Sequence, residues 1–209
     1  MNEFITIKNN VEVQIVEKKS KFIANLFYVE NQEQINESLN IVKKKYHDAK
    51  HNCIAYRIFE DNQVIERFSD DGEPSGTAGS PMLKILQKND LGNILIVVTR
   101  YFGGVLLGTG GLVRAYSESL ILAIEKAEII KKCLGEEVLI TVSYAEFENF
   151  KYYCKNNNIL ITNTEYFENI VCKVELETNK IEKLISDYEE KKVNINNIER
   201  LSKKYIIKI

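Results

Sequence analysis

The chain has 209 residues, 44% of them hydrophobic, which is enough to bury the core of one large domain or two small ones. Its net charge of −2 excludes the broad basic surface of a non-specific DNA-binding protein, and its four cysteines form no C-x-x-C pair, so we predict buried free thiols in a reducing compartment. Neither a signal peptide nor an apolar run of membrane-spanning length is recognisable, so we expect a cytoplasmic protein with no membrane contact.

The first part of the chain predicts an α/β domain that opens with strands. Residues 12–16 and 21–29 are rich in β-forming side chains, and residues 32–46 then carry apolar side chains at helical intervals. Two further short strands, at 51–59 and 63–68, are separated by turn-forming residues and predict a hairpin. The expected order is therefore two strands, a helix and a hairpin.

Two helices and a buried strand complete this domain. Ser80, followed by a proline, predicts the N-cap of a short helix that ends near 89–92. A continuous apolar run at 93–99 is typical of a fully buried strand. Apolar side chains from 112 to 127 then trace one face of a long helix, so the first domain is expected to end near residue 132.

The second half has a simpler order of elements. Gly135, which lies beside charged residues, is the expected hinge, and it divides the chain into domains at 1–132 and 136–209. The elements predicted after it are a strand, a helix, two strands, a helix and a last strand, at 137–144, 145–156, 159–167, 170–177, 179–191 and the residues up to 209. This βαββαβ order is that of the ferredoxin-like fold, so the predicted class is α+β with two domains.

Nine of the ten glycines, and both prolines, lie between Gly72 and Gly111. Glycine is needed where φ is positive or where a ligand or a second backbone must approach closely, so we expect the functional surface in this span. The alternative interpretation is a set of tight turns around a crowded sheet.

Within this span, a glycine-rich loop runs directly into the helix predicted from residue 112. Unpaired amides and the positive end of the helix dipole face such a loop, which predicts an anion site. The predicted anion-binding or nucleic-acid-binding residues are Arg100, Gly103, Gly104, Gly108, Thr109, Gly110, Gly111 and Arg114. Neither the Walker pattern nor the dinucleotide pattern is present, so we expect no cofactor.

A second polar loop precedes the helix predicted at Ser80. It offers a dense set of oxygen ligands from Ser69, Asp70, Asp71, Glu73, Ser75 and Thr77. Such a set could hold Mg²⁺ or Ca²⁺, but the spacing is not that of an EF-hand. Because Asp and Ser commonly cap helices and close turns, we favour structural capping and predict no metal site.

The residues assign no catalytic group. His51 and Cys53 would project from the same face of a strand, an arrangement that leaves two side chains parallel rather than hydrogen-bonded, so a structural role is favoured. Tyr101 and Phe102, beside the glycines, are interpreted as core residues rather than as a platform for stacking bases.

Several of these segments closely resemble the IMPACT family, which includes bacterial YigZ-like proteins. The resemblance rests on KSKFI at 19–23, HNC-x-AYR at 51–57, SDDGEPSGTAG at 69–79 and VVTRYFGGVLLGTGGLVRAYS at 97–117. With its ferredoxin-like second half, the chain resembles the family over nearly its whole length.

This resemblance implies a fold and a setting. The fold is an N-terminal two-layer α/β domain, similar to ribosomal-protein modules and to domain IV of elongation factor G, followed by a domain similar to domain V of that factor. Eukaryotic members regulate translation through contacts with a ribosome-associated protein. No catalytic residue is implied.

Three functions stay open. The leading one is a translation-associated regulatory protein that binds RNA, a nucleotide or a ribosome-associated protein through the glycine-rich loop. The alternative is an enzyme acting on a small phosphorylated or carboxylated substrate, with Asp70, Asp71 or Glu73 as base or metal ligand. The third is a purely structural interaction module, in which the glycines serve packing.

Overall fold

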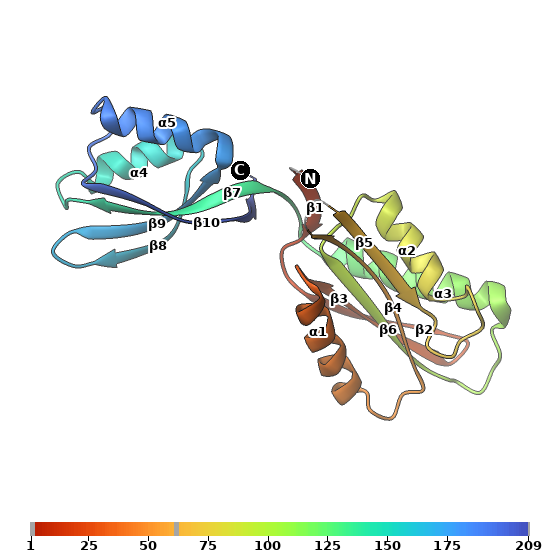
Figure 1. The fold of residues 1–209 in the computed structure, drawn as a ribbon. Helices are drawn as coiled ribbons and strands as arrows, with labels where there is room; N and C mark the ends of the chain where they lie inside the picture. The colour runs from red at the N-terminus through yellow and green to blue at the C-terminus, as the bar shows by residue number, and fades with distance from the viewer. Residues whose placement is uncertain (1–2, 61–62, 209) are drawn as a thin grey trace. The chain divides into compact units, whose positions relative to one another are not determined.

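A computed structural model describes residues 3–60 and 63–208, and the chain divides into two units, residues 3–130 and 131–209 (Figure 1). The predicted class, mixed α+β with two domains, is confirmed. Within the described residues, no helix has both the length and the apolar character needed to cross a bilayer.

The first unit is built on a five-stranded antiparallel sheet in the order β2-β3-β6-β4-β5. Its strands are β1 (Glu3–Ile7), β2 (Val11–Glu17), β3 (Ser20–Tyr28), β4 (His51–Glu60), β5 (Gln63–Ser69) and β6 (Ile94–Tyr101), of which β1 lies outside this sheet. Its helices are α1 (Gln32–Lys45), α2 (Gly79–Lys88) and α3 (Gly108–Lys126). The predicted hairpin is therefore confirmed as β4 and β5, although two residues of its expected turn, 61 and 62, lie outside the described residues.

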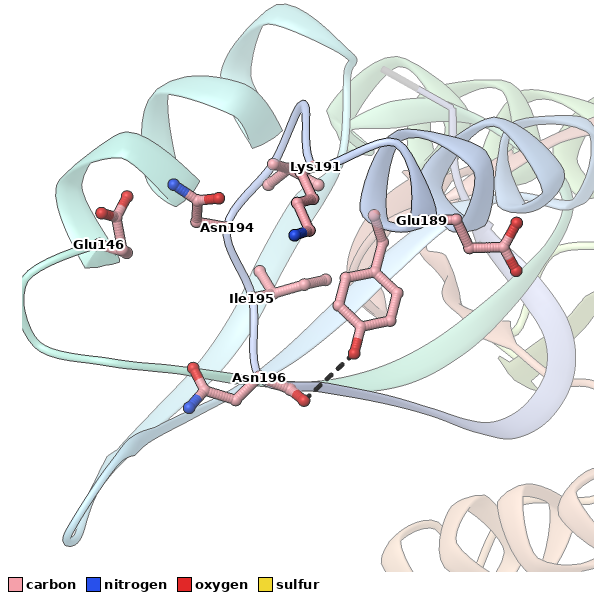
Figure 2. Close-up of a pocket in the computed structure, with 8 residues that line it drawn as sticks. Glu146, Glu189, Lys191, Asn194, Ile195 and Asn196 are labelled. Carbon is pink, nitrogen blue, oxygen red and sulfur yellow. Dashed lines mark hydrogen bonds between the residues drawn. The ribbon is translucent and has the colours of Figure 1, made fainter.

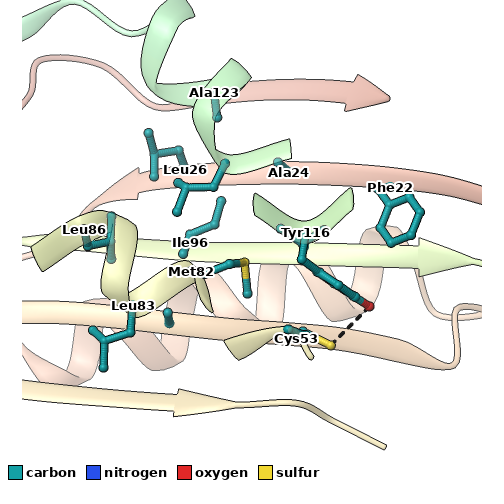
Figure 3. Packing of buried hydrophobic residues seen from close by; sticks show 14 of the residues in the cluster. Phe22, Ala24, Leu26, Cys53, Met82, Leu83, Leu86, Ile96, Tyr116 and Ala123 are labelled. Atoms are coloured by element: carbon teal, nitrogen blue, oxygen red, sulfur yellow. Dashed lines mark hydrogen bonds between the residues drawn. The ribbon is translucent and has the colours of Figure 1, made fainter. Parts of the chain in front are cut away.

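Helices cover both faces of this sheet. Alternate side chains of the central strand β6, such as Ile94 and Ile96, pack with α2 and α3, and Figure 3 shows part of that core. The intervening side chains, such as Leu95 and Val97, pack with Ile35 and other apolar residues of α1. The expected two layers thus correspond to the sheet with α2 and α3, and α1 adds a layer on the opposite face.

The second unit has the predicted βαββαβ order. Its elements are β7 (Ile129–Val142), α4 (Phe147–Asn156), β8 (Leu160–Tyr166), β9 (Ile170–Glu177), α5 (Thr178–Glu189) and β10 (Asn197–Ile207). The strands pair in the antiparallel order β10-β7-β9-β8, and both helices pack on one face over a single apolar core. This is the strand order of the ferredoxin-like fold.

Gly135 is not the hinge that its charged neighbours suggested. It lies inside β7, paired with Glu177 of β9 and Lys204 of β10. A Cβ atom at this position would stand 2.5 Å from the Ile206 side chain and 2.7 Å from the carbonyl oxygen of Leu176. The glycine is therefore required by close packing inside a continuous strand.

Candidate functional site

The acidic loop between β5 and α2 is folded by its own carboxylates. The Asp70 carboxylate accepts hydrogen bonds from the amides of Gly76 at 2.7 Å, Ala78 at 3.0 Å and Gly79 at 2.8 Å. These amides lie at and before the first turn of α2, so Asp70 satisfies donors that a helix N-terminus leaves free. The N-cap position is Ala78 and not Ser80, which lies inside the helix, so the prediction of a serine cap was wrong.

Asp71 connects the same loop to the start of β4 through two polar contacts. Its carboxylate accepts a hydrogen bond from the amide of Asn52 at 2.6 Å, and its carbonyl oxygen lies 2.8 Å from Nδ1 of His51. The Ser69 hydroxyl accepts from the Asp71 amide at 3.2 Å, and Thr77 donates to a backbone carbonyl, while Ser75 is exposed. Among the described residues, no group of three or more acidic, histidine or cysteine side chains has an arrangement that could hold a metal ion.

Glu73, the third carboxylate, forms a buried ion pair with Arg100. Its two oxygens accept from Nη1 of Arg100 at 2.7 and 3.0 Å, and the residues are only 9% and 7% exposed. The rings of Phe22 and Phe102 lie 5.5 and 5.7 Å from the guanidinium carbon. Arg100, predicted as a ligand donor, is therefore neutralised within the protein by a residue of the acidic loop.

The ion pair continues inward as a chain of polar contacts. The Tyr116 hydroxyl donates to Glu73 at 2.8 Å, and Sγ of Cys53 lies 3.3 Å from that hydroxyl, a contact drawn in Figure 3. The thiol also donates to the carbonyl oxygen of Asp70 at 2.9 Å. Burial raises the pKa of Cys53 to about 12, and it also raises the pKa of Tyr116. The thiol therefore stays protonated, and His51 contacts Asp71, so the two do not form a nucleophile–base pair.

We expect Cys53 to resist alkylation in the native protein. With a pKa of about 12 against an ordinary 9.0, its thiolate fraction at pH 8 is lower by about a thousandfold. All four cysteines are buried, so native protein treated with iodoacetamide at pH 8 should remain unmodified by mass spectrometry, whereas protein in urea should gain four adducts. Rapid modification of Cys53 in the native state would contradict this assignment.

The glycine-rich loop after β6 packs against the β2–β3 turn. A Cβ atom at Gly103 would stand 2.0 Å from the carbonyl carbon of Lys19, and the Gly103 amide donates to the Ser20 hydroxyl at 3.1 Å. Lys18 and Lys19 both adopt positive φ, at 45° and 65°, as a two-residue hairpin turn of type I′ requires. Both lysines are exposed, and this packing holds Lys18 beside the start of α3.

The start of α3 presents amides to solvent. Its N-cap, Leu107, makes no side-chain cap, and Gly108, Thr109 and Gly110 are exposed. A pocket of about 240 Å³ adjoins this turn, lined by Glu17, Lys18, Leu107, Gly111, Arg114, Ala115 and Glu118. Across residues 3–60 and 63–208, neither Lys18 nor Arg114 makes a side-chain hydrogen bond or salt bridge.

Of the predicted anion-binding residues, the structure thus brings together the first-turn residues of α3 and Arg114, and it places Arg100 in a separate buried pair. Gly104 and Gly108 have positive φ, at 84° and 70°, so they shape the loop. Sequence reasoning missed Lys18, which is joined to this surface by the approach of the β2–β3 turn. The two adjacent lysines between two predicted strands were the available signal.

The loop from 102 to 107 also carries exposed apolar side chains. Phe102 is 58% exposed and Leu106 is 82% exposed, so the interpretation of Phe102 as a core residue was wrong. Tyr101 is half-buried, and its hydroxyl donates to Asp48 at 2.6 Å. An apolar loop beside two unpaired cations is a surface suited to binding a partner.

Comparison with known proteins assigns both halves of the chain to described domain types. The Impact N-terminal domain matches residues 18–124, and a domain of unknown function, DUF1949, matches residues 140–187. The IMPACT family member YvyE of Bacillus subtilis is 36% identical over 197 residues, covering 94% of this chain and 88% of that protein. The IMPACT family member YigZ of Escherichia coli is 35% identical over 173 residues, covering 81% and 84%. A crystal structure described as a hypothetical protein is 29% identical, covers 97% of this chain and 98% of the other, and has a TM-score of 0.65.

Proposed function

This chain belongs to the IMPACT family, and we propose that it is a translation-associated regulatory protein that binds the phosphate groups of RNA. The proposed contact area comprises Lys18, residues 108–111 and Arg114, and is named here the glycine surface. The proposed role in translation is supported by the resemblance of this chain to the IMPACT family, which implies a ribosome-associated regulator. The choice of ligand follows from the chemistry of the glycine surface.

The observation that carries the proposal is that free backbone amides and unpaired cationic side chains lie next to one another. The first turn of α3 has no side-chain cap, so its amides and the positive end of the helix dipole are available to an anion. Lys18 and Arg114 line the adjoining pocket and supply charged donors. Glu17 and Glu118 line it too, so loss of either cation leaves the acidic side chains in excess.

The size of the pocket supports an extended ligand. At about 240 Å³ it is smaller than most sites that enclose a small molecule, so a free nucleotide would lie largely outside it. A strand of RNA can place one phosphate at α3 and lay unstacked bases against exposed Phe102 and Leu106. The glycine surface is therefore better suited to a phosphate of a polymer than to a free nucleotide.

The carboxylates of the acidic loop argue against the enzyme hypothesis. That hypothesis needs Asp70, Asp71 or Glu73 to act as a base or a metal ligand. Asp70 and Asp71 instead accept hydrogen bonds from backbone amides, and Glu73 accepts hydrogen bonds from the side chains of Arg100 and Tyr116. Each carboxylate already makes hydrogen bonds within the protein, which supports binding rather than catalysis as the function.

Replacing Arg114 with alanine should weaken RNA binding about tenfold, because a lost hydrogen bond to a charged group costs about 1.5 kcal/mol or more. The measurement is fluorescence anisotropy of a labelled twelve-nucleotide single-stranded RNA, titrated with the full chain at several salt concentrations. Binding should weaken as salt rises, since phosphate contacts release counterions. Arg67→Ala is the matched control, because Arg67 is an exposed arginine of β5 in the same unit.

A second variant separates the helix amides from the arginine. Gly110 has open space where a Cβ would stand, so Gly110→Glu should fold normally while placing a negative charge over the first turn. We expect it to abolish the binding that Arg114→Ala only weakens. Absence of saturable RNA binding by the wild type, or equal losses in Arg67→Ala and Arg114→Ala, would refute the proposal.

A further inference from the structure

A cluster of aromatic side chains lies on the surface of the second unit, where β7 and β8 end and α4 begins. It consists of Tyr144, Phe147, Tyr166 and Phe167, which we name the aromatic cluster. The rings of Tyr144 and Tyr166 are 6.5 Å apart, and Phe147 meets Tyr166 edge-on at 6.2 Å. The Tyr144 hydroxyl donates to the carbonyl oxygen of Phe167 at 2.8 Å.

These contacts make the cluster a preorganised surface. Phe147 packs against the core of the unit, and it thereby anchors the exposed ring of Tyr166. Tyr144, Tyr166 and Phe167 are all more than half exposed although they contact one another. Aromatic side chains held together in this way present a large contact area at low entropic cost, which is characteristic of binding surfaces.

The charge around the aromatic cluster identifies the kind of partner. The segments 144–151 and 164–169, which carry the cluster, contain four glutamates and one lysine: Glu146, Glu148, Glu165, Glu168 and Lys151. Glu165 precedes Tyr166 on β8 and points to the other face of the sheet, so three glutamates remain near the cluster. Lys151 is paired with Glu148 at 2.6 Å and lies 4.9 Å from the centre of the Phe147 ring. No salt bridge engages Glu146, Glu165 or Glu168 within residues 3–60 and 63–208. This excess of carboxylates disfavours RNA and favours a cation.

The acidic character continues beyond the cluster through Glu146. This residue also lines a pocket of about 580 Å³ between the start of α4 and the segment after α5 (Figure 2). Tyr188, Glu189 and Ile195 line it as well, together with Lys191, and Tyr188 donates to the carbonyl oxygen of Asn196 at 3.3 Å. A basic side chain that crosses the aromatic cluster would therefore meet the Glu146 carboxylate at the edge of this pocket, whereas in Figure 2 the Glu189 carboxylate points away from the pocket and the Lys191 amine lies inside it.

We propose that the aromatic cluster is a docking surface for an arginine-containing basic segment of a partner protein. Arginine matches both features, because its guanidinium stacks on aromatic faces and forms paired hydrogen bonds with carboxylates. Lys151 over Phe147 already makes this type of cation–π contact within the chain. The proposal is independent of RNA binding at the glycine surface.

The test uses the full chain and a labelled nine-residue peptide of alternating arginine and glycine, followed by fluorescence anisotropy at low salt. We expect saturable binding, weaker binding of the matched lysine peptide, and no binding of the matched glutamate peptide. Tyr166→Ala and Phe167→Ala should each weaken binding of the arginine peptide about twofold to fivefold, as the loss of one exposed cation–π contact implies. Glu168→Gln should weaken it in the same direction.

Tyr152→Ala is the matched control, because Tyr152 is a 69% exposed tyrosine of α4 outside the aromatic cluster. It should leave peptide binding unchanged, and so should Arg114→Ala, which affects only RNA. The inference is overturned if the arginine peptide does not saturate, if Tyr152→Ala weakens it as much as Tyr166→Ala, or if the twelve-nucleotide RNA binds in a manner lost in Tyr166→Ala. Circular dichroism of each variant identifies any loss of peptide binding that misfolding causes. If Tyr166→Ala misfolds, peptide binding by Phe167→Ala tests the proposal in its place.

Discussion

Replacing Arg100 with alanine is expected to lower the free energy of unfolding by about 3–5 kcal/mol, the usual cost of leaving a buried charge without its partner. Glu73 would keep its Tyr116 hydrogen bond but lose both contacts with the guanidinium. The Phe22 and Phe102 rings would also lose the cation packed against them. Urea unfolding followed by circular dichroism measures the change.

Two controls distinguish the ion pair from the other arginine near the glycine-rich loop. Arg114→Ala removes an exposed arginine and should change stability by less than about 0.5 kcal/mol. The double variant Glu73→Leu with Arg100→Met should recover part of the loss, because apolar residues of similar volume commonly replace a buried ion pair without penalty, whereas the buried Tyr116 hydroxyl loses its acceptor. If Arg100→Ala is as benign as Arg114→Ala, the pair does not hold the acidic loop in place.

Gly103→Ala should destabilise the protein by about 2–3 kcal/mol, the upper part of the range for overpacking. The new Cβ would meet the backbone of Lys19 at 2.0 and 2.2 Å and the amide of Ser20 at 2.3 Å, and backbone atoms cannot rotate away as a side chain does. The β2–β3 turn must therefore move, and Lys18 moves with it. Thermal unfolding and RNA titration should both report the change.

Gly110→Ala is the matched control, with an effect of opposite sign. Gly110 lies within α3, has open space where a Cβ would stand, and does not adopt positive φ. Alanine in a helix is more stable than glycine by about 0.5–1 kcal/mol, so this variant should gain stability. Equal destabilisation by the two substitutions would contradict the close approach of the Gly103 loop to the turn.

The periodicity of apolar residues sufficed to predict most helices and strands, because amphipathic patterns are local. It failed at Gly135, where charged neighbours suggested a loop. The reason for that glycine lies 41 residues further on, at Leu176, and also at Ile206, whose atoms occupy the space of its missing side chain. Contacts between strands of this kind leave no trace in the sequence around one residue.

The sequence could locate part of the candidate site, because the residues of that part are neighbours along the chain, and their binding of an anion stays a prediction. The glycines and Arg114 follow one another along the chain, so their approach to the start of α3 could be anticipated. The assignment of Arg100 to the anion was made without its partner, Glu73. The two residues belong to different loops, and the sequence does not show that these loops meet. Lys18 was missed because only the packing of the β2–β3 turn on Gly103 brings it near.

The apolar side chains on both faces of β6 leave its alignment undetermined by burial alone. Sliding the strand by one residue would exchange its two faces, yet each face would still bury aliphatic groups. Polar residues at its two ends remove the ambiguity. At one end the Asn93 side chain accepts a hydrogen bond from the amide of Phe59 at 2.8 Å. At the other end the Thr99 hydroxyl donates a hydrogen bond to the Asn52 side chain at 2.7 Å, and Arg100 forms its ion pair with Glu73. Any slip would break all three contacts at once, so these few polar groups select one alignment among several that the core would tolerate.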